Sequence, residues 1–381
     1  MARFGCTITV DTGKMPSSQT DFTWLATEDN FPTAAIDGGG TSIDNGGGNL
    51  RCYTDDTKAT QLPIEVVSFV TGGTPSVQVW GLSGTLNVAS TVYIEADEVA
   101  TTQPAVGAAF GRNAVWVDYL IVSHLNIDGT TTSGAYINST GGSDGTGVSM
   151  SLPTIAGPHS NNAADFDGSN DFIKFPVSLS DTDDVFTISV WGKCSDLSTD
   201  QRLAGFYQIG NTNAASSILW MDADGSGDGW RAQGRSSTGG ISTVGSDSHD
   251  NATTNWQMLQ QRYGVSTHTL RVDGTQTQQV GAVGNFSSPT NKADEVRVGR
   301  MWDTTTYFNG GISTLAITMS ELPDDYLDSE YNNQSDPSTF WTVGAWEDQD
   351  AGGGRIMGSL VYLGGLTGSG GLTGRGGGLV G

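Results

Sequence analysis

The stretch AADFDGSNDFIKF, residues 163–175, is the most informative segment for the fold of this chain. It predicts a short strand, a tight turn at Asp167-Gly168, and a second strand with apolar side chains at Phe172, Ile173 and Phe175. The segment VFTISVW, residues 185–191, then alternates apolar and polar residues. An alternation with a period of two is typical of a strand with one face on a core. The region therefore predicts an antiparallel β-domain.

These two segments resemble the opening of a laminin-G-like domain of the concanavalin A-like lectin superfamily. Such domains often begin with a hairpin of the pattern FDG-x-x-D-(Y/F)-(I/V), followed by a strand that ends in S-x-W. Later segments also fit strands of that family, namely residues 115–125, 217–220, 255–261, 269–274, 294–299 and 307–317. The resemblance implies a β-sandwich of a kind that binds glycans, calcium or other proteins, and it indicates the fold better than the function.

The first hundred residues resemble an uncharacterised β-sandwich module that commonly precedes laminin-G-like domains in bacterial and phage surface proteins. The resemblance rests on an ordered series of short segments: residues 8–11, 21–25, 49–56, 62–66, 77–80 and 91–94. Helix signals are scarce, and the one good candidate is residues 320–331, with Ser320 as the N-cap.

We therefore expect an all-β protein of two β-sandwich (jelly-roll) domains and a Gly-rich tail. The expected first domain is residues 1–104, and the linker lies near Pro104. The second, concanavalin A-like domain is residues 105–343, and the tail is residues 344–381. We expect the two domains to fold independently.

The charge of the chain excludes several classes of partner. The 381 residues carry a formal net charge of -24, which argues against nucleic acid and against anionic membranes. This charge favours solubility, or alternatively calcium-rich or saline surroundings. No apolar segment is long enough to span a membrane, and no signal peptide is expected. Cys6, Cys52 and Cys194 lack C-x-x-C spacing, so we expect folding in a reducing cytoplasm without disulfides or zinc.

Calcium is the only cofactor that the sequence suggests. Alternating oxygen-bearing residues in the segment 221–229 predict a weak site with Asp222, Asp224 and Asp228 as ligands. The alternative is an acidic hairpin tip without metal. The family resemblance implies a second site, between Asp167, Asp171 and a carboxylate near the last strand, but this chain has Ser313 and Thr314 in the matching region.

Sugar binding is expected from tryptophans beside loops, because flat aromatic rings suit the CH faces of sugars. Trp220, Trp230, Trp256 and Trp302 are the candidates, and of these we expect Trp230 and Trp302 to face a glycan. Trp256 and Trp191 fit core strand positions better.

No pattern in the chain predicts an enzyme. Glu95 and Asp97 resemble part of the E-x-D-x-x-E strand of glycosidases with this fold, but the third carboxylate is missing at the required spacing. The four histidines show no nucleophile motif and no metal-ligand spacing, so we expect isolated surface or strand residues: His124, His159, His249 and His268.

The tail differs in composition from the rest of the chain. A Gly-Gly-Leu unit recurs at Leu366, Leu372 and Leu379, and acidic residues are absent from residue 352 onward. A flexible linker is one interpretation. We favour an assembly element, because similar Gly-Gly-Leu tails follow laminin-G-like domains in some phage structural proteins.

Together these features predict a non-enzymatic structural protein of a phage virion, made in the host cytoplasm and exposed on the particle as a tail, fibre or spike component. Its expected partners are other virion proteins, further copies of itself and a cell-surface glycan, but neither nucleic acid nor a membrane. A capsid decoration (cement) protein is the main alternative, and a glycan-active enzyme is a weaker one.

Overall fold

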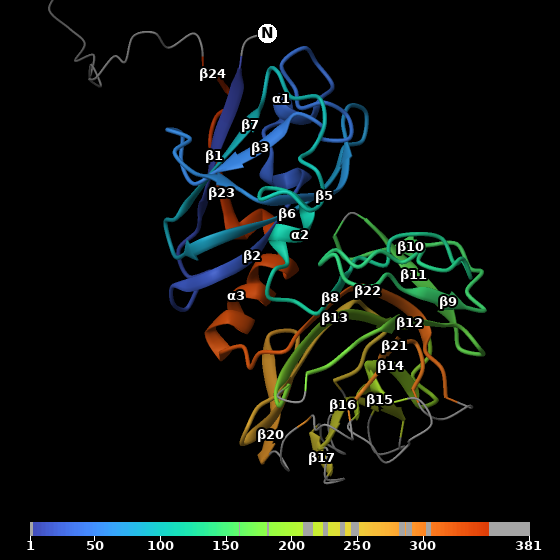
Figure 1. The fold of residues 1–381 in the computed structure, drawn as a ribbon. Helices are drawn as coiled ribbons and strands as arrows, with labels where there is room; N and C mark the ends of the chain where they lie inside the picture. The colour runs from blue at the N-terminus through green and yellow to red at the C-terminus, as the bar shows by residue number, and fades with distance from the viewer. Residues whose placement is uncertain are drawn as a thin grey trace, which may run out of the picture.

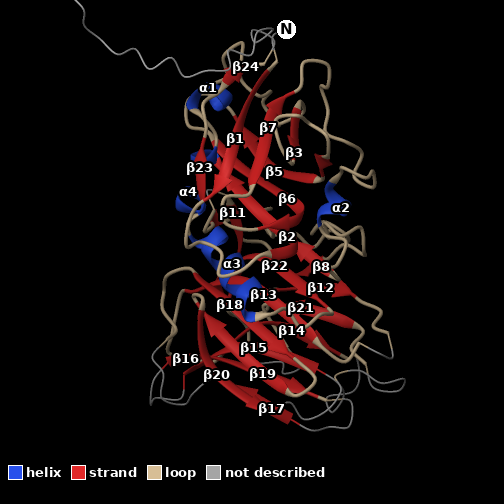
Figure 2. Ribbon diagram, turned by 90° about the vertical axis from the view of Figure 1, so that its left-hand side faces the viewer, coloured by secondary structure: helices blue, strands red, loops and turns tan. Residues whose placement is uncertain are grey.

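The structure is a computed structural model that describes residues 3–159, 161–180, 183–208, 216–223, 228–236, 241–244, 251–281, 286, 292–301 and 306–349. Strands dominate this part of the chain, so the expectation of an all-β fold is confirmed. Two domains with separate cores lie one above the other (Figures 1 and 2). Among the described helices, none is long and apolar enough to cross a membrane.

The first domain is built from two antiparallel sheets around one core. One sheet contains β1 (Phe4–Val10), β7 (Thr91–Ala96), β3 (Leu50–Tyr53) and β4 (Gln61–Leu62). The other has the order β2 (Gln19–Thr27), β6 (Ser76–Leu86), β5 (Ile64–Val70). The short helices η1 (Glu28–Asn30) and α1 (Thr33–Ile36) follow β2. Apolar residues at alternate strand positions fill the space between the sheets, as period-two patterning requires.

The end of the described chain returns to this first domain. The strands β23 (Trp341–Val343) and β24 (Glu347–Asp348) both pair with β1. Trp341 and Phe340, from α4 (Pro337–Phe340), lie in the core of the first domain. The expected boundary between residues 343 and 344 is therefore wrong, because residues 341–343 and 347–348 belong to the sheet of the first domain. The sequence pattern of 341–348 reveals a strand but not its partner.

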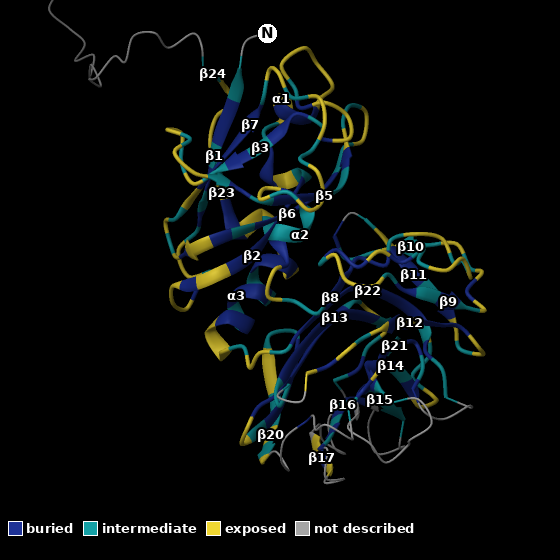
Figure 3. Ribbon diagram, in the orientation of Figure 1, coloured by how far each residue is buried: buried dark blue, intermediate teal, exposed yellow. Residues whose placement is uncertain are grey.

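The second domain packs two larger antiparallel sheets face to face. The first has the order β10 (Ile155–Ala156), β11 (Asn162–Asp167), β22 (Asn309–Thr318), β13 (Phe186–Cys194), β18 (Gln257–Tyr263), β19 (Thr267–Val272), β20 (Thr275–Gly281), and β8 (Ile121–Ser123) also pairs with β22. The second has the order β17 (Ile241–Val244), β16 (Asp228–Arg235), β15 (Ser216–Ala223), β14 (Gln201–Tyr207), β21 (Glu295–Val298), β12 (Phe172–Pro176), β9 (Thr146–Val148). Figure 3 shows β13 and β22 buried along most of their length.

The segment 163–175 forms two strands, as expected, but not a hairpin. β11 pairs with β22 in the first sheet of the domain, whereas β12 pairs with β21 and β9 in the second. Gly168 supplies the turn with a φ of 74°, a left-handed conformation that suits glycine. The chain thus crosses from one sheet to the other, and Phe166 and Phe175 enter the same core from opposite sides.

Helix α3 (Asp324–Ser335) belongs to both domains. It begins after Pro323 rather than at Ser320, because a proline disfavours the helical conformation in the residue before it. The carbonyl oxygen of Ser320 accepts a hydrogen bond from Thr187 on β13. On one side, the side-chain amide of Asn333 donates to the backbone carbonyl of Leu25 and accepts from its N–H. On the other side, Glu330 accepts hydrogen bonds from Ser189 and Gln260.

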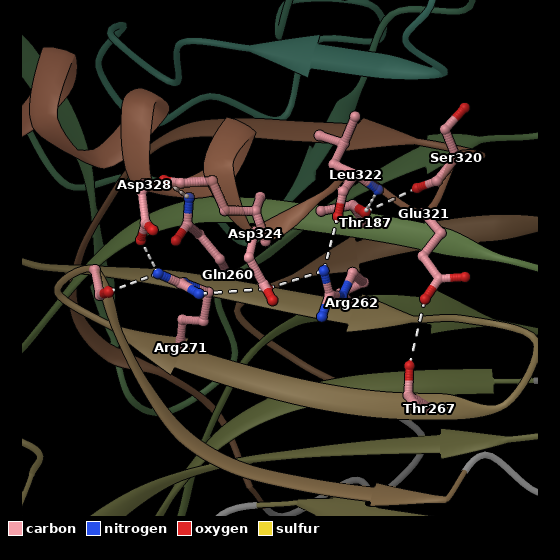
Figure 4. A network of polar contacts seen from close by, with 12 residues as sticks. Thr187, Gln260, Arg262, Thr267, Arg271, Ser320, Glu321, Leu322, Asp324 and Asp328 are labelled. Carbon is pink, nitrogen blue, oxygen red and sulfur yellow. Dashed lines mark hydrogen bonds and ion pairs between the residues drawn. The ribbon is translucent and has the colours of Figure 1, made fainter. Parts of the chain in front are cut away.

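The charged end of α3 is held by two buried arginines of the second domain. Arg262 and Arg271 both contact the Asp324 carboxylate, and Arg271 also contacts Asp328 (Figure 4). Arginine can bridge several oxygens because its guanidinium presents five donors. Helix and sheet are therefore joined by a polar network rather than by an apolar stripe.

A buried carboxylate occupies the junction of the domains. Glu65, on β5, accepts hydrogen bonds from the Trp116 indole at 2.6 Å and the Ser139 hydroxyl at 2.6 Å, and its Oε2 lies 3.0 Å from His124 Nε2. Burial alone would raise the pKa of Glu65, but the charge of His124 and these hydrogen bonds outweigh it and hold the pKa below the ordinary value. Trp80 and Trp116 pack beside the group, and α2 (Arg112–Val115) leads into it.

Candidate functional site

The outer face of the second sheet carries the strongest candidate for a binding surface. Along β21, Val296 and Val298 point into the core, so the intervening Arg297 points outward. The same alternation places Tyr207 and Arg202 of β14, Trp220 of β15 and Arg231 of β16 on that outer face. We call these residues the arginine–aromatic face: Arg202, Tyr207, Trp220, Arg231 and Arg297.

One row of this face places a tryptophan between two arginines. The register pairs Trp220 with Arg202 on one neighbouring strand and with Arg231 on the other. The Arg202 guanidinium lies 5.7 Å from the centroid of the Trp220 ring. The Nε of Arg231 lies 2.7 Å from the carboxylate of Asp222, which holds that guanidinium in place. The indole is half-buried and keeps part of its surface exposed to solvent.

A second contact on this face joins Tyr207 of β14 and Arg297 of β21, which lie diagonally across the strand pair. The Arg297 guanidinium lies 3.6 Å from the centroid of the Tyr207 ring, which is a close stacking contact. Its Nε is paired with Glu295, and its Nη1 donates to the carbonyl of Met301 at 3.1 Å. Trp220 and Tyr207 each therefore lie beside a guanidinium group.

This arrangement suits a polyhydroxylated ligand. Ring faces can cover the CH groups of a sugar, while guanidinium and carboxylate groups exchange hydrogen bonds with its hydroxyls. The described helices pack elsewhere: α3 contacts β2 and β18, and α2 contacts β5 and β6. Within the described residues, therefore, no helix covers the arginine–aromatic face.

The expectation that Trp230 faces a glycan is wrong. Its side chain is 1% exposed in the core of the second domain, and its Nε1 donates to Gln257 at 2.9 Å. The reason is the register, since β16 pairs Trp230 with the inward-facing Met221, while Trp220 on the neighbouring strand faces outward. Trp302 lies outside the described residues, so its expected role stays a prediction. The alternation of residues 217–221 is the sequence signal that could have favoured Trp220 instead.

The predicted calcium loop is only partly described. Asp222 is ion-paired with Arg231, whereas Asp224 and the side chain of Asp228 lie outside the described residues. In the described part of the chain, no group of three or more His, Cys, Asp or Glu side chains is arranged to hold a metal ion. Calcium binding at this loop stays a prediction.

The second possible calcium position contains a buried acid. Asp171 is 1% exposed, its Oδ2 accepts a hydrogen bond from the Asp167 backbone N–H, and its Oδ1 has no hydrogen-bond partner. Burial, with a smaller effect of the Asp167 charge, raises the pKa of Asp171 to about 6. The residue opposite Asp167 on β22 is Asn309, so Ser313 and Thr314 lie several positions away from this pair.

The candidate catalytic carboxylates have structural contacts. Glu95 is 1% exposed and is ion-paired with Lys58, with Arg3 Nε 3.8 Å from its carboxylate. Asp97 accepts hydrogen bonds from the backbone N–H groups of Val99 and Ala100. Both groups therefore hold the local chain in place.

The three described histidines are buried, not exposed. His268 has both ring nitrogens hydrogen-bonded, to Ser242 at 2.9 Å and to Gln261 at 3.0 Å. His124 pairs with Glu65, and His159 lies against Trp191. His249 lies outside the described residues. The Glu65–His124 pair was not predicted, because the two residues are 59 positions apart and share no sequence motif.

The tail residues Leu366, Leu372 and Leu379 also lie outside the described residues. Their role in assembly stays a prediction. All three cysteines are buried free thiols.

Comparison with known proteins agrees with the architecture. Residues 167–328 match the family described as the concanavalin A-like lectin/glucanases superfamily. This match identifies that segment as a laminin-G-like domain with a lectin-like fold. No curated protein matches the chain.

Several solved structures of low sequence identity resemble the chain. One is the CBM40 module of Ruminococcus gnavus IT-sialidase, with 14% identity, a TM-score of 0.36, and coverage of 44% of this chain and 96% of that one. Another is domain 4 of AbnA, a GH43 extracellular arabinanase from Geobacillus stearothermophilus, in complex with arabinotriose, with 15% identity, a TM-score of 0.42, and coverage of 56% and 98%. A third is the binding domain of botulinum neurotoxin DC in complex with SialylT, with 10% identity, a TM-score of 0.42, and coverage of 57% and 52%.

Proposed function

We propose that this protein is a non-enzymatic glycan-binding protein that holds its ligand on the arginine–aromatic face. The observation that carries the proposal is the row in which Trp220 stands between Arg202 and Arg231 on the outer face of the lectin-like domain. A half-buried indole is already immobilised, so stacking a sugar on it costs little additional side-chain entropy.

The ligand class follows from the balance of charge on this face. The guanidinium of Arg231 is next to Asp222, and that of Arg297 is next to Glu295, so positive and negative groups alternate. Alternating donors and acceptors suit the hydroxyls of a neutral sugar, since each hydroxyl both donates and accepts. We therefore propose a neutral oligosaccharide.

The test is a glycan array followed by calorimetry on the best ligand. Trp220→Ala should weaken binding at least tenfold, which corresponds to about 1.4 kcal/mol. Trp346→Ala is the matched control, because Trp346 is a half-buried tryptophan of the first domain whose Nε1 donates to Thr41. An equal loss in both variants, or an array without any ligand, would contradict the proposal.

We assign this glycan-binding protein to the surface of a phage particle, as a tail, fibre or spike component. The support is sequence-based: the series of segments before residue 100 and the Gly-Gly-Leu tail resemble those of phage surface and structural proteins. Partners in this setting are other virion proteins and further copies of the chain. Gold-labelled antibodies on intact particles would locate the protein, and a position on the capsid with no glycan dependence would favour the decoration alternative.

A further inference from the structure

The turn between β10 and β11 lies against both domains. Its Asn161 side chain donates to Gln78 on β6 of the first domain. Its His159 ring packs edge-on against Trp191 of β13, with ring centroids 5.1 Å apart. Trp191 in turn donates to Gln334 of α3 at 2.8 Å. In Figure 1, β10 and β11 lie on the side of the second domain that faces the first. The turn therefore contacts β6 of the first domain and β13 of the second, and Trp191 connects it to α3.

His159 is unusual for a buried polar side chain. It is 4% exposed, and within the described part of the chain neither ring nitrogen has a hydrogen-bond partner. Most buried polar groups are bonded, because desolvation without compensation is costly. Burial, with a smaller repulsion from His124, lowers the pKa of His159 to about 3. The ring is therefore neutral while the turn is in place, and a proton on it would be unfavourable there.

The other titratable groups at the junction do not compensate a charge on His159. His124 is paired with Glu65, and Glu330 of α3 is bonded to Ser189 and Gln260. Burial raises the pKa of Glu330, so its protonation in acid stabilises the closed junction rather than opening it. Among the described residues, no carboxylate lies within ion-pair distance of His159.

We propose that the described part of this turn, residues 157–159 and 161, is a proton-sensitive latch between the two domains. At neutral pH the uncharged His159 ring fills its place beside Trp191, and the turn holds the lectin-like domain against the first domain. In acid the ring takes up a proton, leaves the apolar site and releases the contact between Asn161 and Gln78. The latch is independent of the glycan site, which lies on the other sheet.

The size of the effect follows from linkage. An exposed histidine has a pKa of about 6.5, and the buried His159 ring has a pKa of about 3. Between these two pH values, the equilibrium constant for opening the turn should rise about tenfold for each unit of falling pH. At pH 4.5 the opening equilibrium should be about 100-fold larger than at pH 7. Protonation of Glu65 should raise the same opening equilibrium constant by at most about twofold at pH 4.5, because the ordinary pKa of this carboxyl group is 4.5.

The experiment is hydrogen exchange on the full chain at pH 7 and pH 4.5, corrected for the intrinsic exchange rate at each pH. Peptides that cover 155–162 and 76–80 report the latch. The wild type should open about 100-fold more in acid, whereas His159→Phe and His159→Gln should change less than fivefold. His268→Gln is the control, since His268 is buried within the second domain, and this variant should keep the full response.

Two results would overturn the latch. One is an acid response in both His159 variants equal to that of the wild type. The other is a wild-type protein in which acid increases exchange in the turn no more than in the strands β13 and β22, because equal increases would indicate general acid unfolding. Two different replacements are used because either one alone could perturb packing against Trp191.

Discussion

The junction carboxylate offers the sharpest test of how the domains are held together. In Glu65→Leu, the Trp116 indole N–H, the Ser139 hydroxyl and the His124 ring all lose their acceptor at once. Leucine matches the approximate volume of glutamate, so the change removes hydrogen bonds and charge with little loss of packing. The variant therefore isolates the polar contribution of the junction.

The magnitude follows from those three donors. Leaving a buried donor unsatisfied costs about 1–3 kcal/mol, and breaking a buried ion pair costs about 3–5 kcal/mol. A cavity of about 190 Å³ borders Glu65 and His124, so water can reach some of the freed donors and reduce the cost. We expect a loss of about 4 kcal/mol, against about 1–2 kcal/mol for Glu65→Gln, which keeps one acceptor oxygen.

Urea denaturation followed by tryptophan fluorescence measures this loss, because Trp80 and Trp116 lie beside the carboxylate. Glu347→Leu is the control, since Glu347 is an exposed carboxylate on β24 and its replacement should change stability by less than about 0.5 kcal/mol. A Glu65→Leu variant as stable as that control would refute the reasoning, because the three donors would then need no acceptor.

Three further predictions test other parts of the molecule. Burial lowers the pKa of His268 to about 4, so the folded state binds fewer protons than the unfolded state between about pH 6.5 and 4. Through this group the wild type should lose about 2 kcal/mol of unfolding free energy from pH 7 to pH 5. In urea titrations at the two pH values, the loss in His268→Gln should be smaller than the wild-type loss by about 2 kcal/mol. In Gly81→Ala the new methyl group would lie 2.1 Å from the Trp24 ring, so melting should show a loss of about 1–3 kcal/mol, whereas Gly84→Ala on the same strand meets no atom within 4 Å and should be tolerated. Truncation after Gln349 should leave the melting temperature unchanged. Truncation after Phe340 removes β23, β24 and the buried Trp341, so it should destabilise the first domain. Equal melting temperatures of the two truncated proteins would contradict the pairing of these strands with β1.

The sequence alone predicted the class of fold, because alternation of apolar and polar residues is a local property of each strand. Phe172, Ile173 and Phe175, and the strand that follows them, were correctly placed in β-structure. The turn at Gly168 was also correct, since a left-handed backbone favours glycine wherever it occurs. These features depend on neighbours within a few residues.

The partners of those strands could be decided only by the tertiary structure. β11 and β12 are adjacent in sequence and lie in different sheets, whereas β1 and β23 are more than 300 residues apart and pair directly. The exposure of a tryptophan depends on which strand lies opposite, so Trp230 is buried while Trp220 faces outward. The Glu65–His124 pair and the buried His159 ring arise in the same way, because only the packing of two domains brings such residues together and removes them from water.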